Sequence, residues 1–218
     1  MIRLTKLPLP ANLAQRLAAR AEEYSDLEAQ GAEIPDAVAN GYNHPEIKAL
    51  LRQETAEKCA YCESKVPHVD HGDIEHILSK RHRGDLRFVY ENLTYSCAVC
   101  NNKKRDYHDV DMPLINPYAD IPEEHLAAYG PVVMRLATSD RGLVTQRRLD
   151  LNRPALVERR TERLEQVETL LDQLSRTVNP GIRSVLQDQI QQECERDKEY
   201  SFVVKSFVER ALDLVEQG

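Results

Sequence analysis

Two Cys-x-x-Cys pairs, Cys59/Cys62 and Cys97/Cys100, are the residues of this chain whose spacing most clearly suggests chemistry. A Cys-x-x-Cys turn presents two thiolates to one metal ion, and zinc favours four such ligands in a tetrahedron. Four cysteines leave no coordination position open, so we expect a structural Zn²⁺ that contributes to folding. The fifth cysteine, Cys194, lies in a charged helical stretch, where we interpret it as an ordinary helix residue.

A second set of polar residues lies between the two cysteine pairs and directly after them. Hydrolysis of a phosphodiester needs a base that activates water and a cation that stabilises the developing charge. His76 can be a neutral base near pH 7, and Glu75 with Asn101 offers oxygen ligands to a hard ion such as Mg²⁺ or Mn²⁺. Adjacent strand residues point to opposite faces, so Glu75 and His76 can share a site only at a bulge or strand end. Asn92 is expected to hold the loop that carries His76 by hydrogen bonds to backbone.

An alternative acid–histidine pair, Asp70-His71, lies a few residues upstream. Isoleucines on both sides give Glu75-His76 the character of a strand, whereas Asp70-His71 is followed by a glycine that is typical of turns. We therefore favour Glu75-His76. Asp73 is a candidate for a further or substitute acid.

The charge of the chain is unevenly distributed. Its formal net charge is −7, but residues 59–108 carry eight Lys or Arg against seven Asp or Glu, which leaves −8 on the remainder. This balance predicts a small cationic face on an acidic body and argues against a long non-specific duplex footprint. Candidates for contacts with nucleic-acid phosphates are Lys80, Arg81, Arg83, Lys103, Lys104 and Arg105.

Short strands followed by a helix are expected to position the polar residues. Residues 66–80 have the character of two short strands around Gly72, residues 88–95 form a short apolar segment, and a helix should begin at Asn101. Residues 132–149 indicate short β-like patches with a turn at Gly142.

Helical patterns flank this core on both sides. Residues 12–24 and the stretch from Pro45 towards Cys59 are predicted helices, as is nearly everything after Pro154, with a break at residues 179–181. We divide the chain into an N-terminal arm with helices (1–58), a ββα core (59–108), an irregular connection with short strands (109–153) and a helical region (154–218). The predicted fold class is α+β.

The order of these motifs resembles the HNH endonuclease (ββα-metal) superfamily. More narrowly, it is similar to the PtuB-like HNH nucleases of Septu-type and retron-associated antiphage defence, through the stretches 58–63, 75–77, 116–117 and 149–153 together with Leu156 and Arg160. The family often has a proline and lysine shortly after Glu-His, whereas Ser79 stands here before Lys80.

The resemblance implies a fold and a set of roles. The fold would be a zinc-stapled, treble-clef-like ββα core with mainly helical extensions. His76 would be the general base, Glu75 and Asn101 the metal ligands, Asn92 the residue that orients the loop, and Lys104 a residue facing phosphate. The partners would be nucleic acid, with DNA favoured over RNA, and an ABC-type ATPase like PtuA that controls the nuclease.

Two other functions remain open on the sequence alone. One is a non-catalytic zinc module that binds nucleic acid or protein, although such a module has no need of the set Glu75, His76 and Asn101. The other is a stand-alone restriction-type HNH nuclease, which we would expect to carry its own basic recognition surface. The sequence lacks an apolar run of about 20 residues and an N-terminal apolar segment, so we expect a cytoplasmic protein without membrane association.

Overall fold

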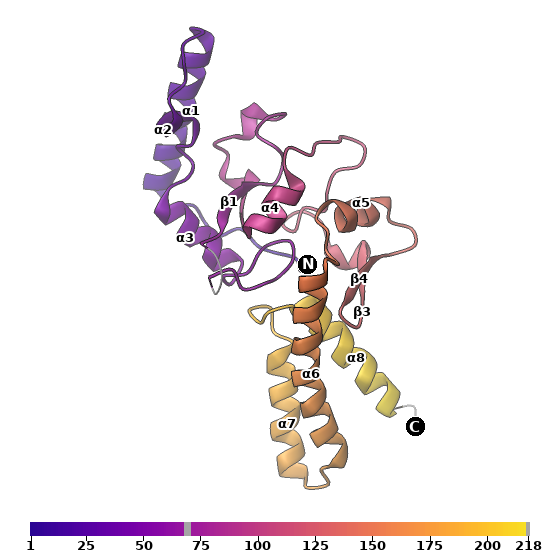
Figure 1. Ribbon diagram of the computed structural model, residues 1–218. Helices are drawn as coiled ribbons and strands as arrows, with labels where there is room; N and C mark the ends of the chain where they lie inside the picture. Colours follow the sequence, from indigo (N-terminus) through magenta and orange to yellow (C-terminus); the bar gives the residue numbers. More distant parts are fainter. Residues whose placement is uncertain (68–70, 217–218) are drawn as a thin grey trace.

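The computed structural model describes residues 1–67 and 71–216, and a ββα unit lies at its centre (Figure 1). Strand β1 (Asp73–His76) pairs antiparallel with β2 (Leu93–Ser96), with Asp73 opposite Ser96 and His76 opposite Leu93. Helix α4 (Ala98–Lys104) follows β2 directly and packs against β1. The predicted α+β class with a ββα core is thereby confirmed.

The two strands are not the pair expected within residues 66–80. The described part of that stretch holds only β1, and its partner β2 comes from the later apolar segment. Gly72 precedes β1 with φ +63°, and a Cβ there would lie 2.4 Å from the buried ring of Tyr95. Glycine is required here because both the backbone conformation and the space exclude a side chain. Helix α4 begins at Ala98, earlier than the predicted Asn101, because Cys97 caps it.

The N-terminal helices lead into the core. They are α1 (Ala11–Ala29), α2 (Asp36–Ala39) and α3 (Pro45–Glu54), which begins with a proline in its first turn as expected. Ile47 and Leu51 of α3 are fully buried, and the helix packs against both strands of the central sheet. This packing fixes the position at which the chain enters the first cysteine pair.

The segment after α4 contains a second hairpin and a helix. Strands β3 (Leu126–Tyr129) and β4 (Val132–Arg135) are antiparallel, and α5 (Asp140–Arg148) packs on β4. The turn predicted at Gly142 is wrong, because Gly142 lies inside α5. Ser139 caps the helix by accepting a hydrogen bond from Gly142 N, and a Cβ at Gly142 would lie 2.2 Å from the carbonyl oxygen of His125. The glycine therefore permits close packing of a helix and does not mark a turn.

Three helices complete the chain: α6 (Pro154–Arg176), α7 (Pro180–Glu193) and α8 (Ser201–Glu216). Helices α6 and α7 form a hairpin that projects away from the core, and α8 returns to pack on β3 and α6 (Figure 1). Glu63, beside the first cysteine pair, accepts hydrogen bonds from Ser201 Oγ (2.9 Å) and Phe202 N (3.2 Å). The helical region is thus joined directly to the cysteine segment.

No helix in the described residues is both long enough and apolar enough to cross a membrane.

Candidate active site and metal centre

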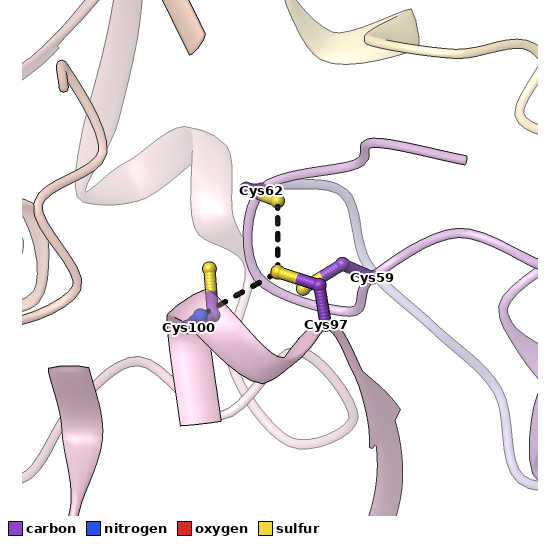
Figure 2. Close-up of side chains that lie close together, drawn as sticks. All are labelled: Cys59, Cys62, Cys97 and Cys100. Carbon is purple, nitrogen blue, oxygen red and sulfur yellow. Dashed lines mark hydrogen bonds between the residues drawn. The ribbon is translucent and has the colours of Figure 1, made fainter. Parts of the chain in front are cut away.

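The four cysteines of the two pairs meet in one cluster (Figure 2). Cys59 and Cys62 lie on the loop after α3, while Cys97 caps α4 and Cys100 stands in its first turn. All four sulfur atoms lie within 4.8 Å of one another, and the Sγ atoms of Cys62 and Cys97 are 3.9 Å apart. Zinc–sulfur bonds of about 2.3 Å in a tetrahedron separate the sulfurs by about 3.8 Å, so the donor set fits Zn²⁺.

Arg153 supplies positive charge next to this cluster. Its Nη1 lies 3.8 Å from Cys100 Sγ. Burial disfavours the charged guanidinium, but the neighbouring thiolates of Cys100 and Cys62 outweigh burial and raise the pKa of Arg153. Four thiolates around one Zn²⁺ carry excess negative charge, which a partly buried arginine offsets.

Two acids of β1 point towards α4. Asn101 Nδ2 donates a hydrogen bond of 2.8 Å to Asp73 Oδ2, and Lys104 Nζ lies 2.7 Å from Glu75 Oε1. Lys104 also donates to the carbonyl oxygen of His76 (2.7 Å). Asp73 and Glu75 share a face because they are two residues apart in one strand. Carboxylate and amide oxygens on facing elements form a donor set that suits a hard divalent cation.

The two acids differ in their access to solvent. Asp73 and Asn101 are half-buried, whereas Glu75 is 6% exposed and Lys104 is 1% exposed. Burial raises the pKa of Glu75 even though the Lys104 ammonium acts in the opposite direction. The solvent-accessible acid is therefore Asp73, which also contacts Asn101 directly. Glu75 is more deeply buried and is paired with Lys104.

His76 is the last residue of β1, so it stands at a strand end, and its ring has other partners than the Glu75 carboxylate. Its Nε2 lies 2.9 Å from the carbonyl oxygen of Arg87, and its ring meets that of Tyr42 edge-on at 4.5 Å between centroids. A carbonyl only accepts, so Nε2 carries the proton and Nδ1 holds the lone pair of the neutral ring. Burial, only partly opposed by this hydrogen bond, lowers the pKa of His76 to about 4. The imidazole is therefore neutral near pH 7 and able to accept a proton at Nδ1.

The four cysteines, Asp73, Glu75, His76 and Asn101 lie within one segment that also matches known proteins. Residues 59–106 match the HNH endonuclease family. The chain is also 33% identical over 89 residues to Septu protein PtuB of Bacillus thuringiensis, a match that covers 40% of this chain and 35% of that protein. A second Septu protein PtuB, from Bacillus mycoides, is 26% identical over 190 residues, covering 71% of this chain and 64% of the relative. The chain thus spans less than two thirds of the length of either relative, and the resemblance to HNH and PtuB-like proteins is confirmed.

Asn92 of the HNH segment holds the loop after His76. Its Oδ1 accepts a hydrogen bond from Leu78 N (2.8 Å), and its Nδ2 donates to the carbonyl oxygens of Leu78 (2.9 Å) and Leu86 (3.3 Å). Asn92 is 5% exposed and stands at the end of a short 3₁₀ turn before β2. One amide therefore fixes both the 77–80 loop and the turn that leads to the Arg87 carbonyl.

Replacement of Asn92 by alanine is expected to destabilise the fold and lower any cleavage rate. The change leaves buried backbone groups of the loop unpaired, which should lower the free energy of unfolding by about 1–3 kcal/mol. Chemical denaturation measures this loss. Asn12→Ala, at an exposed position of α1, is the control and should stay within about 0.5 kcal/mol of the parent. Equal stabilities of the two variants would show that the Asn92 amide does not hold the loop.

The six basic residues proposed to contact phosphate have different environments. Arg81 and Arg83 lie at or near the surface, where Arg81 pairs with Asp106 and Arg83 with Asp85. Lys103 pairs with Asp150. Arg105 is exposed. Lys80 contacts the hydroxyl of Tyr42 and also lies over its ring. Lys104 stands apart, because it is buried and directs its charge to Glu75. Of these residues, Lys104 therefore has the least access to a phosphate.

For the alternative register, Asp70 lies outside the described residues. His71 is exposed, and its carbonyl oxygen accepts a hydrogen bond from Tyr95 Oη (3.2 Å).

Sequence reasoning missed three residues that shape the two sites: Tyr42, Arg87 and Arg153. Tyr42 comes from the loop before α3 and Arg87 contributes a backbone atom, so no local pattern could indicate either. Arg153 stood within the stretch 149–153 that carries the family resemblance, which was the one available signal.

Proposed function

We propose that this chain is a metal-dependent HNH endonuclease that hydrolyses phosphodiester bonds in nucleic acid. The main support is the set of groups around β1: an acid–amide pair, Asp73 and Asn101, and at the end of the strand a neutral, oriented imidazole, His76. A binding module needs neither feature. Glu75, the ligand implied by the family resemblance, remains a candidate beside Asp73.

In the proposed reaction, His76 Nδ1 accepts a proton from a water molecule. The water oxygen forms a bond to phosphorus while the bond from phosphorus to the leaving sugar oxygen breaks, and that oxygen takes a proton from solvent. Lys104 holds both the Glu75 carboxylate and the backbone of His76, and so keeps the end of β1 in place. When bound by Asp73, Glu75 or Asn101, a Mg²⁺ or Mn²⁺ ion would stabilise negative charge on the phosphate. Zinc held by four cysteines has no open position for that task.

The test is cleavage of plasmid DNA, single-stranded DNA and RNA by the purified full chain with and without Mg²⁺ or Mn²⁺. We expect cleavage of at least one substrate that stops when the divalent ion is omitted. Asn101→Ala should lower the rate, with partial rescue by excess metal, whereas the Asn12→Ala control should leave it unchanged. Binding of nucleic acid without cleavage under all conditions, with the ATPase partner present or absent, would instead favour a non-catalytic zinc module.

We also infer that the chain acts in antiphage defence, as an effector nuclease that is controlled by a partner ABC-type ATPase. The support is the similarity to two proteins named Septu protein PtuB, and the acidic body, which binds nucleic acid poorly without help. The projecting α6–α7 hairpin offers a contact surface, because Val178, Ile182 and Val185 near its tip are exposed. Co-purification with an ATPase encoded beside the chain's gene would test this inference. Protection of cells from phage by this chain in the absence of that ATPase would contradict it.

A further inference from the structure

A groove is lined by residues of α4, of the segment that directly follows it and of α5. It encloses about 950 Å³ and is wide open to solvent. Four of its lining residues are basic: Lys103 lies in the last turn of α4, Arg105 directly follows that helix, and Arg147 and Arg148 lie in the last turn of α5. No acidic side chain is among the lining residues. On a chain with a net charge of −7, this local excess of cations is unusual.

Most of these cations have no counter-charge of their own. Lys103 Nζ pairs with Asp150 at 2.9 Å, but among the described residues Arg105, Arg147 and Arg148 form no ion pair. Arg147 and Arg148 are exposed, and the guanidinium of Arg148 lies over the ring of Tyr107 at 4.7 Å. A planar guanidinium matches phosphate oxygens in two-point contacts, so unpaired arginines are suited to bind a phosphate backbone.

Helix α5 is firmly anchored, so its last turn is held in a fixed position. Arg141, near its start, makes a two-point contact with Asp120 and also donates to the carbonyl oxygens of Pro113 and Leu114. Thr145 is fully buried, and its hydroxyl accepts a hydrogen bond from Ile115 N. Arg141 therefore serves the fold, whereas Arg147 and Arg148 on the same helix point their charge at the groove.

The groove is close to the candidate active site. Asn101, which contacts Asp73, and the groove residue Lys103 belong to the same short helix. A helix with its side chains is about 10–12 Å wide, so one bound strand can contact both the groove and the neighbourhood of Asn101.

We propose that the α4–α5 groove holds the phosphate backbone of the nucleic-acid strand beside the scissile bond, with Arg147 and Arg148 as its principal contacts. This inference rests on the proposed nuclease function and adds the surface on which the substrate lies. Val99, Leu143 and Val144 supply apolar surface in the groove, suited to the sugar faces of the strand. The groove also provides basic surface outside the 59–108 core.

The experiment compares Arg147→Ala/Arg148→Ala in the full chain with a control that loses the same charge, Arg16→Ala/Arg176→Ala. Arg16 and Arg176 are exposed on α1 and α6. Binding of a short labelled DNA duplex, its single strand and the matching RNA is measured between about 50 and 200 mM salt, without added divalent ion so that nothing is cut. Loss of two phosphate contacts should reduce the slope of log affinity against log salt by about 1.8 on duplex DNA. Cleavage of the same substrates with Mg²⁺ is measured in parallel.

A reduced slope and affinity in the groove variant, with the control like the parent, supports the inference, and the probe that loses most identifies the strand type. Equal slopes for the groove variant and the control overturn the inference, and if the parent still cleaves, the proposed function stands without it. If the parent binds nucleic acid through the groove but never cleaves it, the inference about the groove stands and the proposed nuclease function is wrong. If the parent binds none of the three nucleic acids, the inference about the groove is wrong as well.

Discussion

Replacement of His76 by alanine is expected to lower the cleavage rate by a factor of about 10²–10⁴, the usual cost of losing a general base. The reason is geometric. Its Nε2 proton is committed to the Arg87 carbonyl, so Nδ1 is the atom that can take a proton, and burial keeps the ring neutral near pH 7. The measurement is the rate at saturating substrate and metal. Zinc content and partner binding should be unchanged.

A second substitution separates catalysis from packing, because the His76 ring also fills space beside Tyr42. His76→Gln can still donate a hydrogen bond to the Arg87 carbonyl but cannot act as a base at neutral pH. It should retain more of the parent's free energy of unfolding than His76→Ala while being equally inactive. A glutamine variant that cleaves at the parental rate would show that His76 only supports the fold.

His71→Ala is the matched control for the choice of register. His71 is exposed and precedes β1, so its loss should have a much smaller effect on the rate. An inactive His71→Ala variant beside an active His76→Ala variant would identify Asp70-His71 as the acid–base pair instead.

The sequence was sufficient to predict those parts of the two sites that depend on local spacing. The spacing of two residues within each cysteine pair predicts a metal-binding turn, and the two pairs therefore identified the four-cysteine cluster without knowledge of the fold. The strand pairing was harder, since the segment between β1 and β2 has no simple turn signal and the second strand was sought too early in the chain. Helix α5 was missed because a glycine that permits close packing has the same sequence signature as a turn.

The contacts that join the helical region to the core were beyond sequence reasoning. Lys58 Nζ donates to the carbonyl oxygen of Lys198 (2.8 Å), and Glu63 binds the start of α8. The partners of Lys58 and Glu63 lie far along the chain and are partly backbone atoms, which no residue pattern reveals. Both residues flank the first cysteine pair, so the helical region is connected directly to the four-cysteine cluster.

Loss of the zinc cluster is expected to have the largest effect on the fold. The cluster joins the loop after α3 to the start of α4, the helix that carries Asn101 and Lys104. Structural zinc contributes about 10–16 kcal/mol of apparent binding free energy in small zinc-dependent peptides, so its removal should cost this larger chain several kcal/mol of stability. We expect one zinc per chain, and Cys97→Ser should lower both zinc content and the thermal midpoint.

Cys194→Ser is the matched control for this prediction, because Cys194 follows α7 and lies outside the four-cysteine cluster. Elemental analysis of the control should give the parental zinc content, and its unfolding should be nearly unchanged. Cleavage should fall with zinc in the Cys97→Ser protein, because Asn101 can face Asp73 only while α4 is held at its first turn. A parent without zinc, or a Cys97→Ser protein with parental zinc content and stability, would show that the four cysteines do not hold a structural ion.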